Sequence, residues 1–207
     1  MPSAAETWDS RYNDPAFHPA PQPNPFLLES LPFLPPGCAL DLAGGAGQNS
    51  VALVARGWPV AAVDVSLSAL DRAETLAHSH HLPVRRVLAS AIPREFPPSH
   101  AELFLIRADL EHFSLPASAF DVILCFRYLQ RSLFPAIERA LRPGGVLVFE
   151  TFTVDQLSFD RGPRNPGHLL RPGELRDAFP GLAHIFSREW KSTESMASLL
   201  ARKPLHP

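Results

Sequence analysis

The feature that most constrains the fold is the stretch from Leu40 to Ser50, LDLAGGAGQNS. A short apolar run, 38–42, carries one carboxylate, Asp41, and is followed at once by glycines at positions 44, 45 and 47. Glycine adopts positive φ and lets another group approach the main chain. Apolar spacing from Asn49 onward predicts a helix whose first N–H groups lack partners inside the helix. A strand, a glycine-rich turn and a helix in this order predict a ligand-binding turn of an α/β protein.

The rest of the chain alternates between segments with the pattern of strands and segments with the pattern of helices. Strands are expected at 59–65, 102–108, 120–126 and 146–152, and 84–88 competes with 102–108 for the role of third strand. Helices are expected at 5–12, 26–31, 49–56, from Ser66 or Ser68 to about 78, at 133–141 and at 173–179. The last two strands, 184–190 and 196–203, are too close for a crossover and must form an antiparallel hairpin. The predicted fold class is α/β: a doubly wound, Rossmann-like, seven-stranded and mostly parallel sheet with that hairpin at its C-terminal end.

Composition places the chain among ordinary globular domains, with 207 residues, 45% hydrophobic and 19% charged. The formal net charge of −2 gives no basic footprint, so no nucleic-acid partner is expected. No apolar run approaches the roughly 18 residues of a membrane span, and the N-terminus lacks the features of a secretory signal. Cys38 and Cys125 each lie within an apolar run and are interpreted as buried thiols in a reducing, cytoplasmic setting. The oligomeric state cannot be predicted from these features.

The glycine turn departs from the dinucleotide-binding pattern GxGxxG. Gly45-Ala46-Gly47 is followed by Ser50 where a third glycine would stand. The carboxylate of Asp41 would disfavour a diphosphate and suit a cation or an amino group. An acidic residue followed by such a turn resembles the first motif of the class I S-adenosylmethionine-dependent methyltransferases.

The resemblance continues in order over residues 38 to 153. Asp64, at the end of the second expected strand, matches the acidic residue that holds the ribose hydroxyls in that family. Asp109-Leu110-Glu111 matches the segment that brackets the adenine; Phe120–Ile123 and Arg142–Gly145 match the later strand and turn. Ala43 stands where the family most often has its first glycine. The resemblance implies S-adenosyl-L-methionine as cofactor, held by Asp41, Ala43, Gly44, Gly45, Gly47, Asn49, Asp64, Val65, Asp109, Leu110 and Phe126.

Three further segments resemble the small, tellurite-resistance-type branch of the family. They are Trp8-Asp9-Ser10-Arg11-Tyr12, the proline-rich run 21–25, and Glu150-Thr151-Phe152-Thr153. This branch implies a small-molecule acceptor, and the length of 207 residues fits a single domain. We expect residues 1–36 to form a cap or lid, 37–153 the cofactor-binding core, and 154–207 the substrate loop and terminal hairpin.

Residues for the acceptor are expected after the fourth and fifth strands. Arg127 and Tyr128 are the candidates for the catalytic position, although Tyr128 could equally pack against the methionine part of the cofactor. Guanidinium groups bind oxyanions as a bidentate fork, so the arginines after the fifth strand suggest an anionic acceptor. The candidate substrate residues are Arg161, Arg164, Arg171, Trp8 and Tyr12. Alternatively, the arginines belong to a solvated loop and are balanced by Asp155 and Asp160.

Two other functions remain open on sequence grounds. A nicotinamide-dependent Rossmann oxidoreductase would share the first half of the fold, although the missing third glycine and the terminal hairpin argue against it. A catalytically silent adenosylmethionine-binding partner domain is the other alternative. The histidines at 78, 80 and 81 have no cysteine or paired carboxylate near them in sequence, so no metal site is expected.

Overall fold

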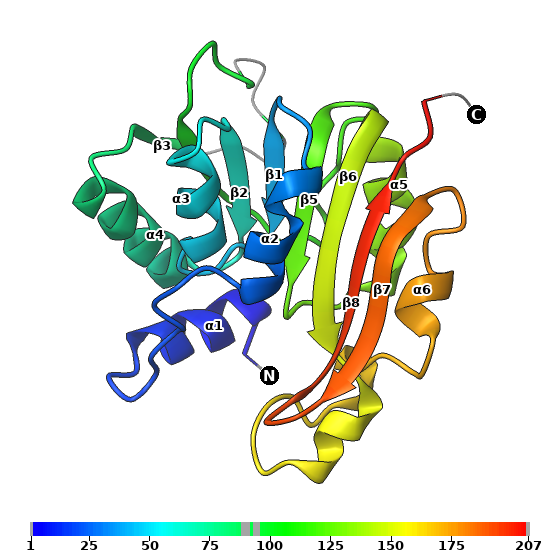
Figure 1. The fold of residues 1–207 in the computed structure, drawn as a ribbon. Helices are drawn as coiled ribbons and strands as arrows, with labels where there is room; N and C mark the ends of the chain where they lie inside the picture. The colour runs from blue at the N-terminus through cyan, green and yellow to red at the C-terminus, as the bar shows by residue number, and fades with distance from the viewer. Residues whose placement is uncertain (1, 88–91, 93–95, 206–207) are drawn as a thin grey trace.

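The chain forms one twisted eight-stranded sheet with helices on both faces (Figure 1). The structure, a computed structural model, describes residues 2–87, 92 and 96–205. The strand order is β3-β4-β2-β1-β5-β6-β8-β7, and β8 runs antiparallel to both of its neighbours while the other pairs are parallel. The strands are β1 (Ala39–Leu42), β2 (Val60–Asp64), β3 (Val84–Val87), β4 (Leu103–Arg107), β5 (Phe120–Phe126), β6 (Leu141–Phe152), β7 (Ala183–Lys191) and β8 (Ser195–Arg202).

The sheet has eight strands where seven were expected, because both candidates for the third strand form. In the predicted fold class, which is otherwise confirmed, β4 pairs with β2 and β3 adds one more parallel strand outside it. Leu103 donates its N–H to the carbonyl of Pro83 at 2.9 Å, at the start of that extra pairing. The expected strand ran on to Leu88, which lies outside the described residues.

The helices begin and end close to the predicted positions. They are α1 (Ala4–Asn13), α2 (Pro25–Ser30), α3 (Gln48–Val54), α4 (Leu67–Ser79), α5 (Phe134–Ala140) and α6 (Glu174–Asp177). Ser66 caps α4, as its hydroxyl accepts the N–H of Ala69 at 3.1 Å. The helix α6 is shorter than the expected 173–179: it begins after Gly173, which is left-handed (φ 75°), and its last residue is Asp177. Short 3₁₀ turns lie at Leu31–Phe33, Arg131–Leu133, Val154–Ser158 and Pro166–His168.

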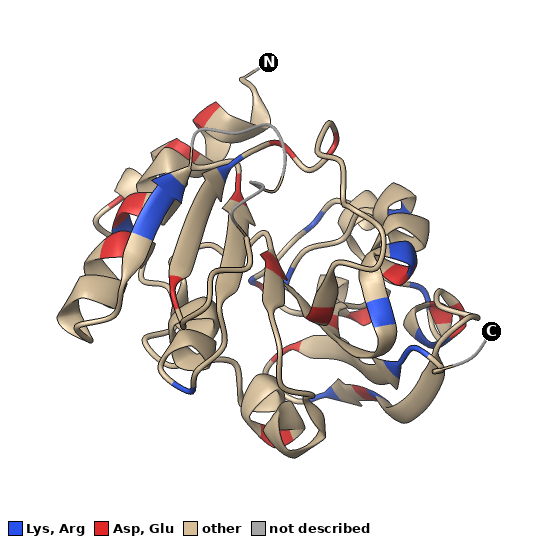
Figure 2. Cartoon of the chain, turned by 90° about the horizontal axis from the view of Figure 1, so that it is seen from above, with Lys and Arg blue, Asp and Glu red and all other residues tan. Residues whose placement is uncertain are grey.

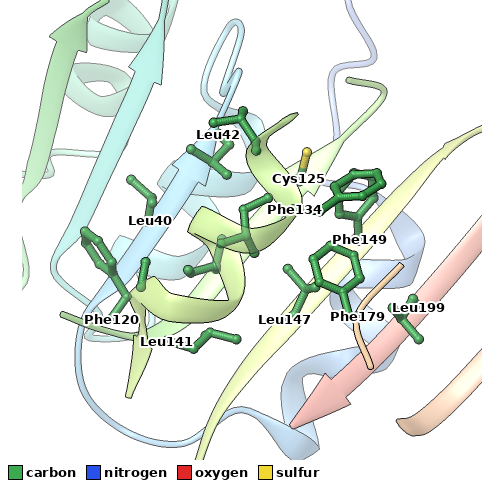
Figure 3. Packing of buried hydrophobic residues seen from close by; sticks show 14 of the residues in the cluster. Leu40, Leu42, Phe120, Cys125, Phe134, Leu141, Leu147, Phe149, Phe179 and Leu199 are labelled. Carbon is green, nitrogen blue, oxygen red and sulfur yellow. The ribbon is translucent and has the colours of Figure 1, made fainter. Parts of the chain in front are cut away.

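Buried apolar side chains form a layer on each face of the sheet. Along β1, Leu40 and Leu42 point to one layer and Ala39 to the other, as the two-residue period of a strand requires. In the first layer the rings of Phe134, Phe149 and Phe179 lie 5.1–6.0 Å apart between centroids (Figure 3). Burying one such side chain contributes about 1.5–3 kcal/mol. Both cysteines are buried free thiols, as predicted.

The carboxyl ends of the parallel strands define the edge where a ligand is expected. The strand order reverses between β1 and β5, and the segments that flank this edge are α1 on one side and the chain after β6 on the other (Figure 1). Acidic and basic residues are interspersed over the molecule, and neither sign gathers on one face in the view of Figure 2. Among the described residues, no helix has the length and apolar character needed to cross a membrane.

Candidate functional site

Asp41 is a buried carboxyl group in β1, near the end of the strand that leads into the glycine loop. Only 2% of the residue is exposed, and the hydroxyl of Ser50 donates to Oδ2 of Asp41 at 2.6 Å. Burial raises the pKa of Asp41 to about 7, and the nearby charge of Asp64 adds to the effect. Ser50 belongs to α3, so the residue that replaces the third glycine of a dinucleotide-binding turn serves here as the partner of Asp41.

Asp64 fixes the glycine loop from the neighbouring strand. Its Oδ2 accepts the N–H of Gly45 at 2.8 Å, and its Oδ1 accepts the N–H of Ser66 at 2.9 Å. The residue is 8% exposed, and burial raises its pKa although these amide donors act in the opposite direction. The bonds therefore join the end of β2, the turn after β1 and the start of α4 into one unit.

The glycines of the loop are required by neighbouring protein atoms. Gly47 has φ +81°, and a Cβ there would lie 2.6 Å from Cβ of Ala73 in α4. Gly45 has φ +55°, and a Cβ there would lie 2.6 Å from Oη of Tyr12. At Gly44 the nearest atom would be Oδ2 of Asp41, at 3.3 Å. Sequence reasoning attributed the missing side chains to a ligand, whereas the space at Gly45 and Gly47 is taken by α1 and α4.

Ala43 has a left-handed main-chain conformation, which favours glycine, the residue most often found at this place in the family motif. Its φ is +53°, in the left-handed region where a residue other than glycine is disfavoured. The departure from the family pattern at this position therefore leaves a strained residue at the start of the loop. Gly44, the next residue, donates its N–H to the carbonyl of Val63 at 3.1 Å, which anchors the turn to β2.

The helix α1 is anchored on the start of α4 and covers the glycine loop. Asp9 accepts the hydroxyl of Ser66 at 2.6 Å and the N–H of Ser68 at 3.0 Å. Arg72 donates to the carbonyl of Tyr12 and, at 3.2 Å, to that of Phe17. Burial, followed by the charge of Asp64, raises the pKa of Tyr12 to about 12, so its hydroxyl stays protonated at neutral pH.

Trp8 and Tyr12, which were both expected to contact the substrate, are neighbours on α1 with different surroundings. Tyr12 lies over the glycine loop, while Trp8 is 40% exposed and packs beside Tyr12 with 6.2 Å between ring centroids. The guanidinium of Arg11 lies over the Trp8 ring at 5.2 Å. Tyr12 is thus grouped with the expected cofactor residues, and Trp8 lies on the outer side of α1.

A buried polar network ties the proline-rich segment to the sheet. Asn24 donates its main-chain N–H to Oδ1 of Asn49 at 2.8 Å and its side-chain amide to Oε1 of Glu150 at 2.9 Å. The hydroxyl of Ser198 donates to Oε2 of Glu150 at 2.6 Å. Asn49, which was expected to bind the cofactor, contacts the N-terminal segment with its side-chain carbonyl oxygen. Sequence reasoning did not predict the partnership of Asn24 and Glu150, because they are 126 residues apart.

The loop after β5 holds the two candidates for the catalytic position. Arg127, with φ +55°, makes a bidentate ion pair with Glu194, at 3.1 and 2.8 Å, and lies over the ring of Phe152. The hydroxyl of Tyr128 donates to Gln130, and burial raises the pKa of Tyr128 well above its ordinary value. Both side chains are therefore engaged with protein groups. Glu194, in the turn between β7 and β8, was not predicted to take part.

The segment expected to hold adenine lies at the end of β4. Oδ1 of Asp109 accepts the N–H of Glu111 at 3.0 Å, so Asp109 closes its own turn. Leu110 is 5% exposed and Phe126 is 8% exposed, and both pack in the core. Val65 follows Asp64 directly, and its carbonyl accepts the guanidinium of Arg107 at 3.3 Å.

The arginines after β6 are exposed and contact mainly main-chain atoms. Arg161 donates to the carbonyl of Thr193 at 3.1 Å, and Arg164 to that of Leu157 at 3.0 Å. Arg171 donates its main-chain N–H to Glu174 at 2.8 Å. Within the described ranges, no ion pair joins Asp155 or Asp160 to any of the three arginines.

The carboxylate acceptors at the glycine loop fit a ligand with hydroxyl groups and a positive charge. Each oxygen of Asp64 accepts one N–H and keeps a lone pair for a further donor. Asp64, together with Asp41 in its ionised form, would repel a diphosphate. The set therefore suits a nucleoside that carries an ammonium or sulfonium group better than a dinucleotide.

Comparison with known families and sequences agrees with this chemistry. A family model described as "Methyltransferase domain" matches residues 40–149, which is more than half of the chain. The chain is also 30% identical, over 135 residues, to a malonyl-[acyl-carrier protein] O-methyltransferase of Herminiimonas arsenicoxydans. That match covers 63% of this chain and 43% of the relative, so the chain spans less than half of the relative's length.

Solved structures share the fold over nearly the whole chain. The protein solved in work on the conversion of a disulfide bond into a thioacetal group during echinomycin biosynthesis has a TM-score of 0.69 at 18% identity, covering 98% of this chain and 93% of that one. TehB from Haemophilus influenzae has a TM-score of 0.66 at 16% identity, covering 96% and 66%. At these identities the likeness shows the fold and does not select a branch or an acceptor.

Proposed function

The chain belongs to the methyltransferase-domain family, as a class I S-adenosylmethionine-dependent methyltransferase, and from this premise we propose that it methylates the carboxylate of a small anionic acceptor. The acceptor we propose is the free carboxylate of a malonyl-type thioester. The name of the relative from Herminiimonas arsenicoxydans supports this choice, as do the exposed arginines after β6. The nicotinamide alternative is set aside by the family match.

The observation that carries the proposal is the nature of the two side chains after β5. Arg127 is paired with Glu194, and its guanidinium is protonated at neutral pH as in any arginine. Burial raises the pKa of Tyr128, so its hydroxyl is protonated as well, and neither side chain can remove a proton. Thiols and phenols must lose a proton before they attack a methyl group, whereas a carboxylate is ionised already. An acceptor that needs no general base is therefore the one that suits these residues.

The cofactor supplies an electrophilic methyl group on a sulfonium. The roles we propose for this chain's residues are to bind and orient it. Asp64 accepts the ribose hydroxyls, Asp41 faces the ammonium group, and Asp109 accepts the adenine amino group. The loop of Gly44, Gly45 and Gly47 carries the main-chain contacts. Methyl transfer in line depends mainly on the alignment of the two reactants, which such positioning provides.

We propose that residues 1–36 act as a cap over this cofactor site. Support comes from the anchoring of α1 by Asp9 and Arg72 and from the position of Tyr12 beside Gly45. The hydrogen bond from the side-chain amide of Asn24 to Glu150 fixes the second half of the cap. A closed cap excludes water, so that the sulfonium and the carboxylate meet in a dry and ordered environment.

A coupled assay for adenosylhomocysteine release tests the proposed function. The panel contains malonyl-coenzyme A and malonyl-acyl carrier protein as carboxylates, with small thiols, phenols, selenite and tellurite as the other acceptor classes. Turnover of the malonyl thioesters above all others supports the proposal. Preference for selenite, tellurite or a thiol would overturn it, and cofactor binding without turnover of any acceptor would favour the silent partner domain.

A further inference from the structure

The chain after β6 forms a compact loop whose two ends meet at the end of that strand. The N–H of Leu170 donates to the carbonyl of Phe152 at 2.9 Å, and the N–H of Val154 donates to the carbonyl of Leu170 at 2.8 Å. Residues 154–169 therefore form an Ω-loop, and it carries Arg161 and Arg164. Its ends lie at the carboxyl edge of the sheet, beside the loop after β5.

The first half of the Ω-loop is fixed from inside. Gln156 is fully buried, and its amide donates to the carbonyl of Arg161 at 2.8 Å while its oxygen accepts the N–H of Ser195 at 2.8 Å. The hydroxyls of Thr153 and Ser195 lie 2.7 Å apart. These contacts join the first half of the loop to the start of β8. The second half of the loop is fixed by other groups.

Arg131, in the loop after β5, fixes that second half. Its guanidinium donates to the carbonyl of Gly167 at 2.8 Å, to the carbonyl of Leu169 at 2.9 Å, and through two nitrogens to the carboxylate of Glu174. A planar fork can serve four acceptors in fixed directions, which a lysine ammonium cannot do. The hydrogen bonds from Arg131 hold the pKa of Glu174 below its usual range.

The carboxylate of Glu174 also fixes the main chain of Arg171, one of the residues expected to bind the methyl acceptor. Its Oε2 accepts the main-chain N–H of Arg171 at 2.8 Å as well as the guanidinium of Arg131. Arg131, which follows Arg127 and Tyr128 in the chain, thus connects the loop after β5 to the second half of the Ω-loop and to the segment that contains Arg171. A contact of this kind fixes the distance between the bound acceptor and the methyl group of the cofactor. A 1 Å misplacement of reacting groups can cost about 100-fold in rate.

We propose that Arg131 is a positioning residue for the acceptor: with Glu174 it holds the second half of the Ω-loop and the backbone of Arg171 in the arrangement that receives the acceptor carboxylate. This role rests on the proposed function. It assigns the acceptor geometry to a preformed, hydrogen-bonded loop and not to the cofactor site, which lies across the sheet edge at Asp41 and Asp64.

The test compares Arg131→Ala and Arg131→Lys with wild type in three measurements. Steady-state kinetics with malonyl-coenzyme A give kcat and KM, calorimetry gives the dissociation constant of adenosylhomocysteine, and hydrogen exchange reports on residues 154–171. Arg176→Ala is the matched control, because Arg176 lies in α6 and, among the described residues, its guanidinium pairs with its exposed neighbour Asp177 alone. We expect both Arg131 variants to raise KM for the acceptor by about tenfold to a hundredfold. Exchange should accelerate at Leu170 and Val154, and adenosylhomocysteine affinity should stay within about twofold.

Several results would overturn the proposal. One is an unchanged acceptor KM, another is wild-type exchange in Arg131→Ala, and a third is full rescue by lysine, which would show that charge alone is needed. Equal losses of acceptor and adenosylhomocysteine binding would mean that Arg131 serves the fold in general. A wild-type protein that binds no adenosylhomocysteine would refute the proposed function instead, while the exchange rates, measured without cofactor, would still decide whether Arg131 fixes the loop.

Discussion

The hydroxyl oxygen of Tyr12 lies 2.6 Å from the point that a Cβ atom on Gly45 would occupy. The N-terminal helix is therefore packed against the glycine loop as closely as the missing side chain permits. Gly45 has φ +55°, so its replacement would also strain the main chain. The contact joins the expected cap directly to the expected cofactor site.

Gly45→Ala should displace α1 from the loop. The new methyl group must push Tyr12 away, and we expect faster hydrogen exchange over Ala4–Asn13 together with weaker adenosylhomocysteine binding. Gly57→Ala is the matched control, because Gly57 also has positive φ but no atom within 4 Å of the new Cβ. Both variants should lose about 1 kcal/mol of stability from backbone strain. Equal exchange over α1 in the two variants would show that Tyr12 does not hold the helix in place.

Asp41→Asn should change how stability depends on pH. The folded protein keeps the Asp41 proton up to about pH 7, since burial raises its pKa, while the unfolded chain releases it near 3.8. The unfolded state therefore binds fewer protons between these values, and this group lowers the free energy of unfolding as the pH rises from 4 to 7. The full effect is of the order of 4 kcal/mol above pH 7.

Asparagine keeps an oxygen that can accept the hydroxyl of Ser50 and removes the titration. The difference in unfolding free energy between Asp41→Asn and wild type should therefore grow from pH 5 to pH 7 in favour of the variant. Urea denaturation at a series of pH values measures it. A difference that does not vary with pH would mean that Asp41 ionises normally in the folded protein. The variant should also bind adenosylmethionine more weakly, because the carboxylate is lost.

Ala43→Gly should stabilise the protein or leave it unchanged. Ala43 has φ +53°, where glycine avoids a cost of about 1–2 kcal/mol but loses about 0.4–1 kcal/mol through the freer unfolded chain. Ala46→Gly, three residues on, is the control, because Ala46 has no positive φ and should lose stability by about 0.5–1 kcal/mol. Thermal unfolding of the two variants compares the signs. A loss of the same size at both positions would show that Ala43 is not strained.

Much of the fold followed from local patterns. The apolar run before Asp41, the glycine turn and the capping serine at position 66 each specify an element through contacts within a few residues. The segment 84–88 was predicted only as a rival to 102–108 and not as an eighth strand, because Val84–Val87 is half exposed and its pairing with β4 depends on a partner 19 residues away.

The site was predicted less completely than the fold, for a physical reason. Residues at strand ends, such as Asp41 and Asp64, are brought together by the sheet itself, and their positions could be inferred from the order of elements. Glu150 with Asn24 and Arg127 with Glu194 are side-chain pairs between distant segments. Their meeting depends on rotamers and loop paths that no periodicity records. For that reason Arg127 was expected to be available to the acceptor, whereas an ion pair engages it.

Arg164→Ala should act on the acceptor and not on the cofactor. Its guanidinium is exposed and donates to one main-chain carbonyl, which leaves its charge available to an anion. If it contacts the acceptor carboxylate, KM for malonyl-coenzyme A should rise by about tenfold to a hundredfold, and the effect should shrink at high salt. Arg139→Ala, an exposed arginine of α5, is the control. Equal constants for the two variants and wild type would show that Arg164 is only a surface charge.

Carboxylate methylation is tested most directly by the product formed from malonyl-coenzyme A and adenosylmethionine with a deuterated methyl group. We expect a malonyl methyl ester in which the formerly free carboxylate carries the deuterated methyl, as seen by mass spectrometry. The product should be abolished when Asp64→Ala removes the acceptor of the Gly45 and Ser66 N–H groups. A control reaction with acetyl-coenzyme A, which lacks the free carboxylate, should give no methylated product. Methylation of the control, or unmodified malonyl thioester from a protein that binds adenosylhomocysteine, would refute carboxylate methylation by this protein.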